Sequence, residues 1–159
     1  MLRRILDLPL LVILMGITAL VMYLPAVHAL ALRDFAVARP FFYAATVLFA
    51  LTAMIAIAVS NRRPRNMAQG HLAALLGAFV VIPVMCALPL HEAVRDTSFL
   101  NAWFEMLSSF TTTGATLYDT PGRLPVSVHL WRALVGWMGG FFVLLSAVAI
   151  LAPLNLGGV

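Results

Sequence analysis

The chain has 159 residues, of which 63% are hydrophobic and only 10% are charged, and its mean hydropathy is +1.02. A soluble domain averages about a quarter charged residues, so this composition excludes a soluble globular protein. The basic residues are all arginine and stand at segment ends, which favours contact with anionic membrane lipids rather than with nucleic acid. The apolar runs are continuous and lack the alternation of a membrane β-barrel. They predict an all-α integral membrane protein.

Four apolar runs are long enough to cross a membrane. They are residues 8–24, 41–59, 72–90 and 126–151. Because Arg3 and Arg4 precede the first run and Ala26-Val27-His28-Ala29 follows it, a cleaved signal peptide is an alternative for this segment. We favour an uncleaved span, since the run exceeds the usual apolar core of about 7–15 residues. These runs predict two leading transmembrane helices in residues 1–66 and a second unit in residues 67–159.

Prolines predict where these helices end or bend. Pro25 should end the first helix, and Pro40 should open the second at a first-turn position. Pro83 should kink the third helix, and Pro89 should help to end it.

A short apolar segment, Phe99–Phe110, lies between the third and fourth spans, and Thr97 or Ser98 could cap it. As a helix it measures about 18 Å, whereas the hydrocarbon core is about 30 Å thick. It should therefore stop near mid-membrane, followed by the polar run 111–116. Non-helical backbone at that depth must line water or lie inside protein. This pattern is typical of a re-entrant pore helix and loop.

The polar run, Thr111-Thr112-Thr113-Gly114-Ala115-Thr116, has the chemistry of a cation filter. Stacked backbone carbonyls can replace the water shell of a cation without a full charge. Glycine permits backbone conformations that turn carbonyls toward an axis, and the negative end of the short helix dipole points at the loop. The alternative is that Gly114 only ends the helix as a left-handed cap.

The arginine distribution predicts the orientation. Three arginines cluster in the short 61–66 loop and two stand in the first four residues, which indicates that these segments are cytoplasmic. The pore loop would then enter from the outer face. Both termini would lie inside.

The short apolar segment, the polar run after it and part of the fourth span resemble the first pore region of the Trk/Ktr/HKT potassium transporter superfamily, most closely its TrkH type. The resemblance rests on Phe104-Glu105, on the 108–116 run, and on the later Trp-Met-Gly-Gly at 137–140. It implies an outer helix at 72–90, a pore helix at 99–110, a filter at 111–116 and an inner helix at 126–151. The implied potassium-binding carbonyls, flanked by Thr111 and Thr116, are those of Thr112, Thr113, Gly114 and Ala115.

The resemblance also implies function and surroundings. We expect one quarter of a potassium pathway in the bacterial inner membrane, with potassium as substrate and no cofactor. The other pore units would come from a longer or split protein or from further copies, and a cytosolic TrkA-type nucleotide-binding subunit is an implied partner. A non-conducting membrane fragment or scaffold is the alternative function. An enzyme is not expected, since neither Gly-x-Ser-x-Gly nor His-Glu-x-x-His occurs.

Three further features carry expectations. Glu105 should have a structural role in the pore helix, with its carboxylate hydrogen-bonded to loop amides behind the filter; the alternative is that it pairs with Arg132 or Arg123 or raises the local cation density. The small-residue spacing of Gly136 and Gly140 should allow close helix packing. The tryptophans divide into interfacial anchors and one core residue. The anchors are Trp103 and Trp131, and the core residue is Trp137.

Overall fold

The computed structural model describes residues 9–60 and 67–151, which form an all-helical bundle. The elements in chain order are α2 (Leu10–Val21), α3 (Tyr23–Ala31), α4 (Phe35–Val59), α5 (Met67–Ala93), α6 (Phe99–Phe110), the 3-10 helix η1 (Pro121–Arg123) and α7 (Val126–Leu151). Four stretches are long and apolar enough to cross a membrane: 10–31, 35–59, 73–93 and 126–148. The predicted fold class is confirmed for the described residues, and the chain is a multi-pass membrane protein.

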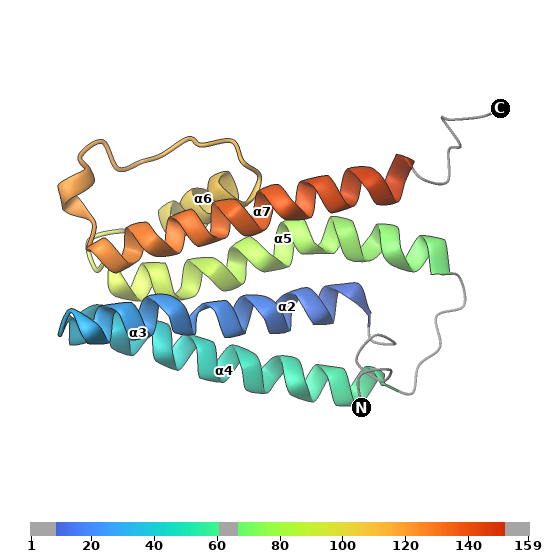
Figure 1. Cartoon of the computed structure of the whole chain (residues 1–159), viewed down its shortest axis with the longest axis horizontal. Coiled ribbons are helices and arrows are strands. Elements are labelled where there is room, and N and C mark those ends of the chain that lie inside the picture. Colours follow the sequence, from blue (N-terminus) through green and yellow to red (C-terminus); the bar gives the residue numbers. More distant parts are fainter. Residues whose placement is uncertain (1–8, 61–66, 152–159) are drawn as a thin grey trace.

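The four long stretches lie side by side and alternate in direction along the bundle (Figure 1). Helix α6 is different, because its 12 residues reach only about 18 Å. It leaves from one end of the bundle, and the chain after it returns to that same end, where α7 begins (Figure 1). This is the re-entrant path that the length of the segment predicts.

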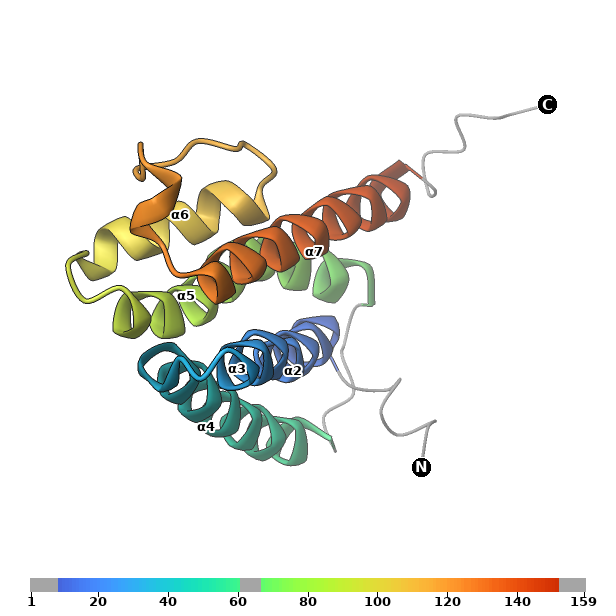
Figure 2. The ribbon, with the colours of Figure 1, turned by 60° about the vertical axis from the view of Figure 1, so that its left-hand side comes forward.

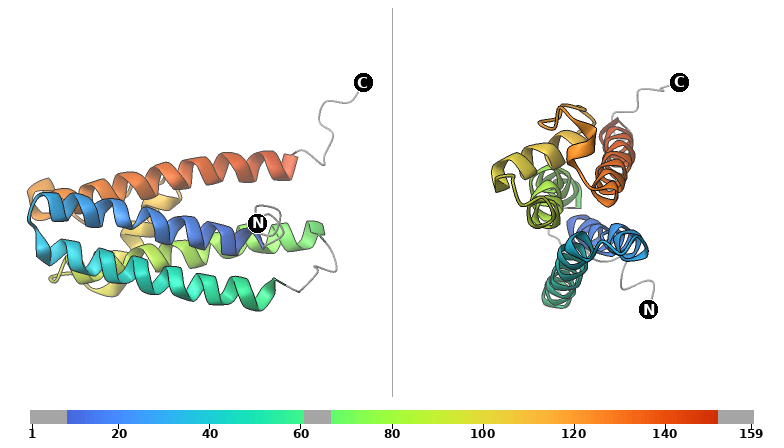
Figure 3. Two further views of the ribbon diagram at one scale, coloured as in Figure 1. Left: turned by 60° about the horizontal axis from the view of Figure 1, so that its bottom comes forward. Right: turned by 90° about the vertical axis from the view of Figure 1, so that its left-hand side faces the viewer.

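The helices form two groups in space. Helices α2, α3 and α4 pack together, and α5, α6 and α7 form the second group (Figure 2; Figure 3). Edge-to-face packing of Phe41 on Trp131, with ring centroids 5.7 Å apart, joins the groups. The His28 Nδ1 atom also lies 2.9 Å from the Ser127 hydroxyl oxygen. The leading helices therefore support the start of α7. The division into two leading helices in residues 1–66 and a second unit in residues 67–159 stays a prediction.

Side-chain caps mark the starts of α4 and α6. Asp34 caps α4 by accepting the Val37 amide at 3.2 Å, so α4 begins five residues before Pro40. The first span does not end at Pro25, because it turns at Met22 and resumes as α3. Pro25 occupies the first turn of α3, where no helical partner for its missing N–H is needed. The predictions that Pro25 ends the first helix and that Pro40 opens the second were therefore wrong.

Ser98 caps α6, as expected, by accepting the Asn101 amide at 3.2 Å. Helix α5 is longer than predicted. It starts at Met67 and continues past Pro89 to Ala93, so Pro89 does not end it. An internal proline removes one backbone bond, and packing against four other helices outweighs this loss in α5.

The tryptophan predictions were wrong for α7. Trp131 is completely buried and donates its indole N–H to the Cys86 carbonyl at 3.1 Å, so it is a core residue rather than an interfacial anchor. Trp137 is 72% exposed and stacks on Phe141. At 3.6 residues per turn, a residue six positions after Trp131 points well away from the face that meets α5.

Candidate functional site

The end of α6 shapes the start of the polar loop. Thr111 is the C-cap, and the amides of Thr112 and Thr113 donate to the carbonyls of Ser109 and Ser108 at 3.1 and 2.9 Å. This pair of bonds is a Schellman motif, whose left-handed residue is usually glycine. Here that residue is Thr112, with φ +58°. The helix is therefore capped before Gly114 is reached, and the alternative role predicted for Gly114 as the helix cap is wrong.

Gly114 introduces a second left-handed residue. Its φ is +75°, while Thr113 between the two is not left-handed. A Cβ added at Gly114 would meet nothing within 4 Å, so only the backbone conformation favours glycine here.

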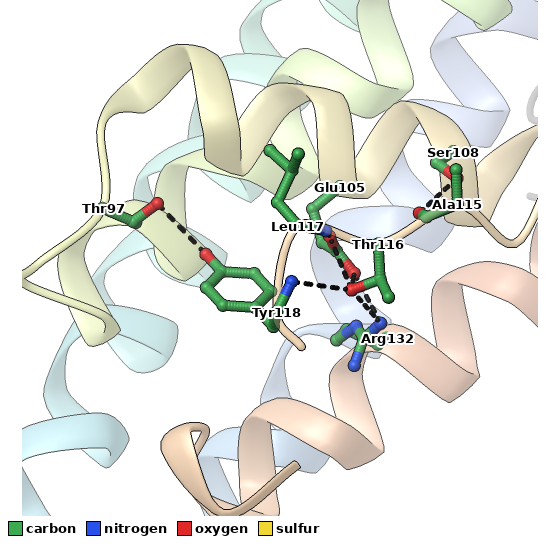
Figure 4. Close-up of polar contacts among 8 residues, drawn as sticks. All are labelled: Thr97, Glu105, Ser108, Ala115, Thr116, Leu117, Tyr118 and Arg132. Atoms are coloured by element: carbon green, nitrogen blue, oxygen red, sulfur yellow. Dashed lines mark hydrogen bonds and ion pairs between the residues drawn. The ribbon is translucent and has the colours of Figure 1, made fainter. Parts of the chain in front are cut away.

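The carbonyl oxygens of Thr112, Thr113 and Gly114 accept no hydrogen bond from the described part of the chain, and all three residues are exposed. Ala115 differs, because its carbonyl accepts the Ser108 hydroxyl at 2.7 Å (Figure 4). The four predicted filter residues thus lie in one continuous loop, but three have unengaged carbonyls and the fourth is tied to α6.

Two threonine side chains hold the start of the loop through hydrogen bonds of their hydroxyl groups. The Thr111 hydroxyl donates to the Leu107 carbonyl at 2.8 Å and lies 2.9 Å from the Thr113 hydroxyl. Because the single Thr111 proton is used on Leu107, Thr113 must be the donor in the second contact. Both threonines therefore use their hydroxyls to hold the turn.

Glu105 holds the returning chain against α6 and α7. Its carboxylate is fully buried, forms an ion pair with Arg132, and accepts the Leu117 amide and the Thr116 hydroxyl at about 3 Å (Figure 4). Arg132 also donates to the Thr116 hydroxyl oxygen at 3.1 Å. The predicted hydrogen bond of Glu105 to a loop amide is confirmed, and the ion pair with Arg132 that the alternative included occurs beside it. Arg123 is not its partner.

The return segment, residues 115–125, leads from Gly114 back to α7, and two further side-chain contacts hold its outer part. The Tyr118 hydroxyl donates to Thr97 at 3.1 Å inside the protein (Figure 4). Arg123 forms an ion pair with Asp96 at 2.8 Å, with both side chains about half exposed. Hydrogen bonding to Asp96 raises the pKa of Arg123. Such an exposed pair contributes little to stability.

Three glycines of α7 lie against the end of α6 and Thr112. A Cβ at Gly139 would lie 1.9 Å from the Phe110 carbonyl oxygen, whereas one at Gly136 or Gly140 would keep 3.7 Å from its nearest neighbour. The predicted close packing is present, but Gly139 is its closest point. The spacing of Gly136 and Gly140 suggested a helix contact without identifying that residue.

Sequence reasoning also missed two contacts of the return segment. They are the hydrogen bond from Ser108 to the Ala115 carbonyl and the one from Tyr118 to Thr97. Ser108 precedes the threonine run, so its polarity was visible, but its bond to a residue seven positions later depends on the path of the loop. The described residues contain no group of three or more His, Cys, Asp or Glu side chains suited to a metal ion.

Comparison with known proteins connects this architecture to ion transport. No family model and no solved structure matches the chain. The Trk system potassium uptake protein TrkH of Salmonella typhimurium is 32% identical over 147 residues, which cover 86% of this chain and 28% of that protein. The chain is homologous to the Trk potassium uptake proteins.

Two further relatives agree with this assignment. The Trk protein TrkG of Escherichia coli is 36% identical over 81 residues, covering 50% of this chain and 17% of TrkG. An uncharacterized cation transporter of Methanocaldococcus jannaschii is 32% identical over 91 residues, 57% of this chain and 19% of that transporter. The chain thus spans less than a third of the length of these Trk relatives.

Proposed function

We propose that this chain forms one wall of a potassium pathway across a membrane, with potassium as the transported substrate. The observation that carries the proposal is the loop after α6. It presents the unengaged carbonyls of Thr112, Thr113 and Gly114 in a stretch where Thr112 and Gly114 have positive φ. The names of the Trk relatives point to the same ion.

The chemistry of the loop suits a monovalent cation. Neutral carbonyl dipoles can replace part of the water shell and still release the ion, which a carboxylate would hold more tightly. The C-terminal end of α6 adds about half a negative charge beside these carbonyls. The only buried carboxylate nearby, Glu105, is neutralised by Arg132 within the described structure and holds the loop in place.

One loop cannot surround an ion, so the pathway needs further walls. The described residues hold one unit, made of outer helix α5, re-entrant helix α6 and inner helix α7. Three similar units, from a longer protein, a second chain or other copies, would complete the ring. A cytosolic TrkA-type nucleotide-binding subunit would regulate it. We place the chain in the bacterial inner membrane with both termini cytoplasmic, because the arginine-rich 61–66 segment favours the cytoplasm.

Potassium-limited growth of a transporter-deficient strain tests conduction. The chain is expressed alone and together with the sequences that flank it in its genome. Growth in either case, accompanied by rubidium uptake, supports a conducting unit. Failure in both cases, with the protein present in the membrane, refutes conduction and favours the non-conducting scaffold.

Gly114→Ser tests the loop itself in any conducting assembly. A side chain at φ +75° costs about 1–2 kcal/mol, enough to shift the carbonyl alignment, so sodium should compete better with rubidium uptake. Gly122→Ser is the matched control, because Gly122 has no positive φ and no neighbour within 4 Å of an added Cβ. Unchanged selectivity in Gly114→Ser would reject Gly114 as a determinant.

A further inference from the structure

A groove of about 950 Å³ opens between the first half of α4 and the end of α5. Three small residues four positions apart, Ala36, Pro40 and Ala44, line it from α4, with Tyr43 and Val47 beside them. Residues at this spacing share one helix face, and their small size accounts for the hollow. The α4 residues that line the groove, from Phe35 to Leu48, extend over about 20 Å of helix. The groove therefore runs from the end of a transmembrane span toward its middle.

The outer end of the groove is basic. Arg39 and Arg95 both line it and are exposed, and neither forms an ion pair with any described residue. His91 also lines it, and its Nδ1 atom is buried without a hydrogen-bond partner in the described structure. Exposed Glu92 contributes one negative charge. The groove thus combines an apolar inner part with a polar end of net charge +1.

We propose that this groove binds one anionic glycerophospholipid, with its phosphodiester between Arg39 and Arg95 and an acyl chain along Tyr43 and Val47. Guanidinium groups match phosphate oxygens with paired hydrogen bonds, and two arginines without protein partners are available for them. The apolar part and its position on a membrane span select a lipid over a soluble phosphate. The volume falls within the range of about 300–1,000 Å³ typical of ligand sites.

The net charge selects the class of headgroup. A phosphodiester with one negative charge, as in phosphatidylglycerol, matches the +1 of the groove, whereas Glu92 would repel a second negative charge. Phosphatidylcholine carries no net charge and should bind more weakly. This inference rests on the membrane fold alone and does not depend on potassium conduction.

Native mass spectrometry of the purified full chain in detergent tests the site with dioleoyl phosphatidylglycerol and dioleoyl phosphatidylcholine. The wild type should retain phosphatidylglycerol preferentially. Arg39→Gln/Arg95→Gln should weaken that binding by about 30-fold, the fold-change expected when two arginines near a lipid headgroup contribute about 1 kcal/mol each. Arg33→Gln is the matched control, because exposed Arg33 lies between α3 and α4, two residues before α4 begins, and does not line the groove.

Ala44→Leu tests the apolar part, since a larger side chain on the groove floor should lower phosphatidylglycerol affinity without changing the charge. Circular dichroism confirms that each variant keeps its helix content. Equal binding by wild type and the double arginine variant would overturn the proposal. It would also be overturned by an equal loss in Arg33→Gln, by equal retention of the two lipids, or by wild-type affinity in a folded Ala44→Leu protein.

Discussion

Gly139→Ala should separate the end of α6 from α7. The added methyl would lie 1.9 Å from the Phe110 carbonyl oxygen, 2.6 Å from its carbonyl carbon and 2.7 Å from its Cα. Ordinary contact begins at 3.4 Å, so the backbone must move by about 1.5 Å, the difference between 3.4 and 1.9 Å. The obstacle is a helix backbone, which cannot rotate away as a flexible side chain can.

Two opposing terms set the size of the effect. Overpacking of this kind costs about 1–3 kcal/mol, while alanine gains up to about 1 kcal/mol over glycine in a helix interior. We therefore expect a net loss of up to about 2 kcal/mol relative to the wild type. Because Phe110 precedes the loop directly, the same displacement should move the carbonyls of Thr112 and Thr113 and reduce rubidium uptake in a conducting assembly.

Thermal unfolding in detergent, followed by circular dichroism, measures the stability change. Gly136→Ala and Gly140→Ala are the controls, since each added methyl would keep 3.7 Å from its nearest neighbour. Both should be neutral or slightly stabilising. If Gly139→Ala unfolds at the same temperature as these two variants, the close contact between α7 and Phe110 does not exist as described.

Three further substitutions test the fastening of the return segment by the same unfolding measurement. Glu105→Gln leaves Arg132 without its charge partner, and a loss of about 2–4 kcal/mol is expected for a buried pair. Arg123→Ala breaks an exposed pair and should cost less than about 1 kcal/mol; an equal loss in the two would contradict the assigned burial. Ser108→Ala should cost about 1 kcal/mol and release the Ala115 carbonyl, changing ion selectivity, whereas Ser109→Ala should change neither.

Much of the fold follows from the sequence, because in a membrane the length and polarity of each segment restrict its path. Spans need about 20 apolar residues, and Phe99–Phe110 is too short to be one. The bounds of α6 and α7 agree with those expected from sequence. Helix bounds were less predictable where prolines were expected to set them, since the Asp34 cap and the packing around α5 determined the observed bounds.

The candidate loop was visible as a run of hydroxyl residues around Gly114, since no other polar run of that kind interrupts the apolar segments. Only the tertiary structure shows which residues do what within it. The left-handed cap falls on Thr112, the Ala115 carbonyl is bound by Ser108, and Gly139 rather than Gly136 or Gly140 meets α6 most closely. These outcomes depend on how the backbone returns from α6 and on the rotation of α7 against it. A linear pattern of residue types contains neither quantity, because each is set by contacts between segments distant in the chain.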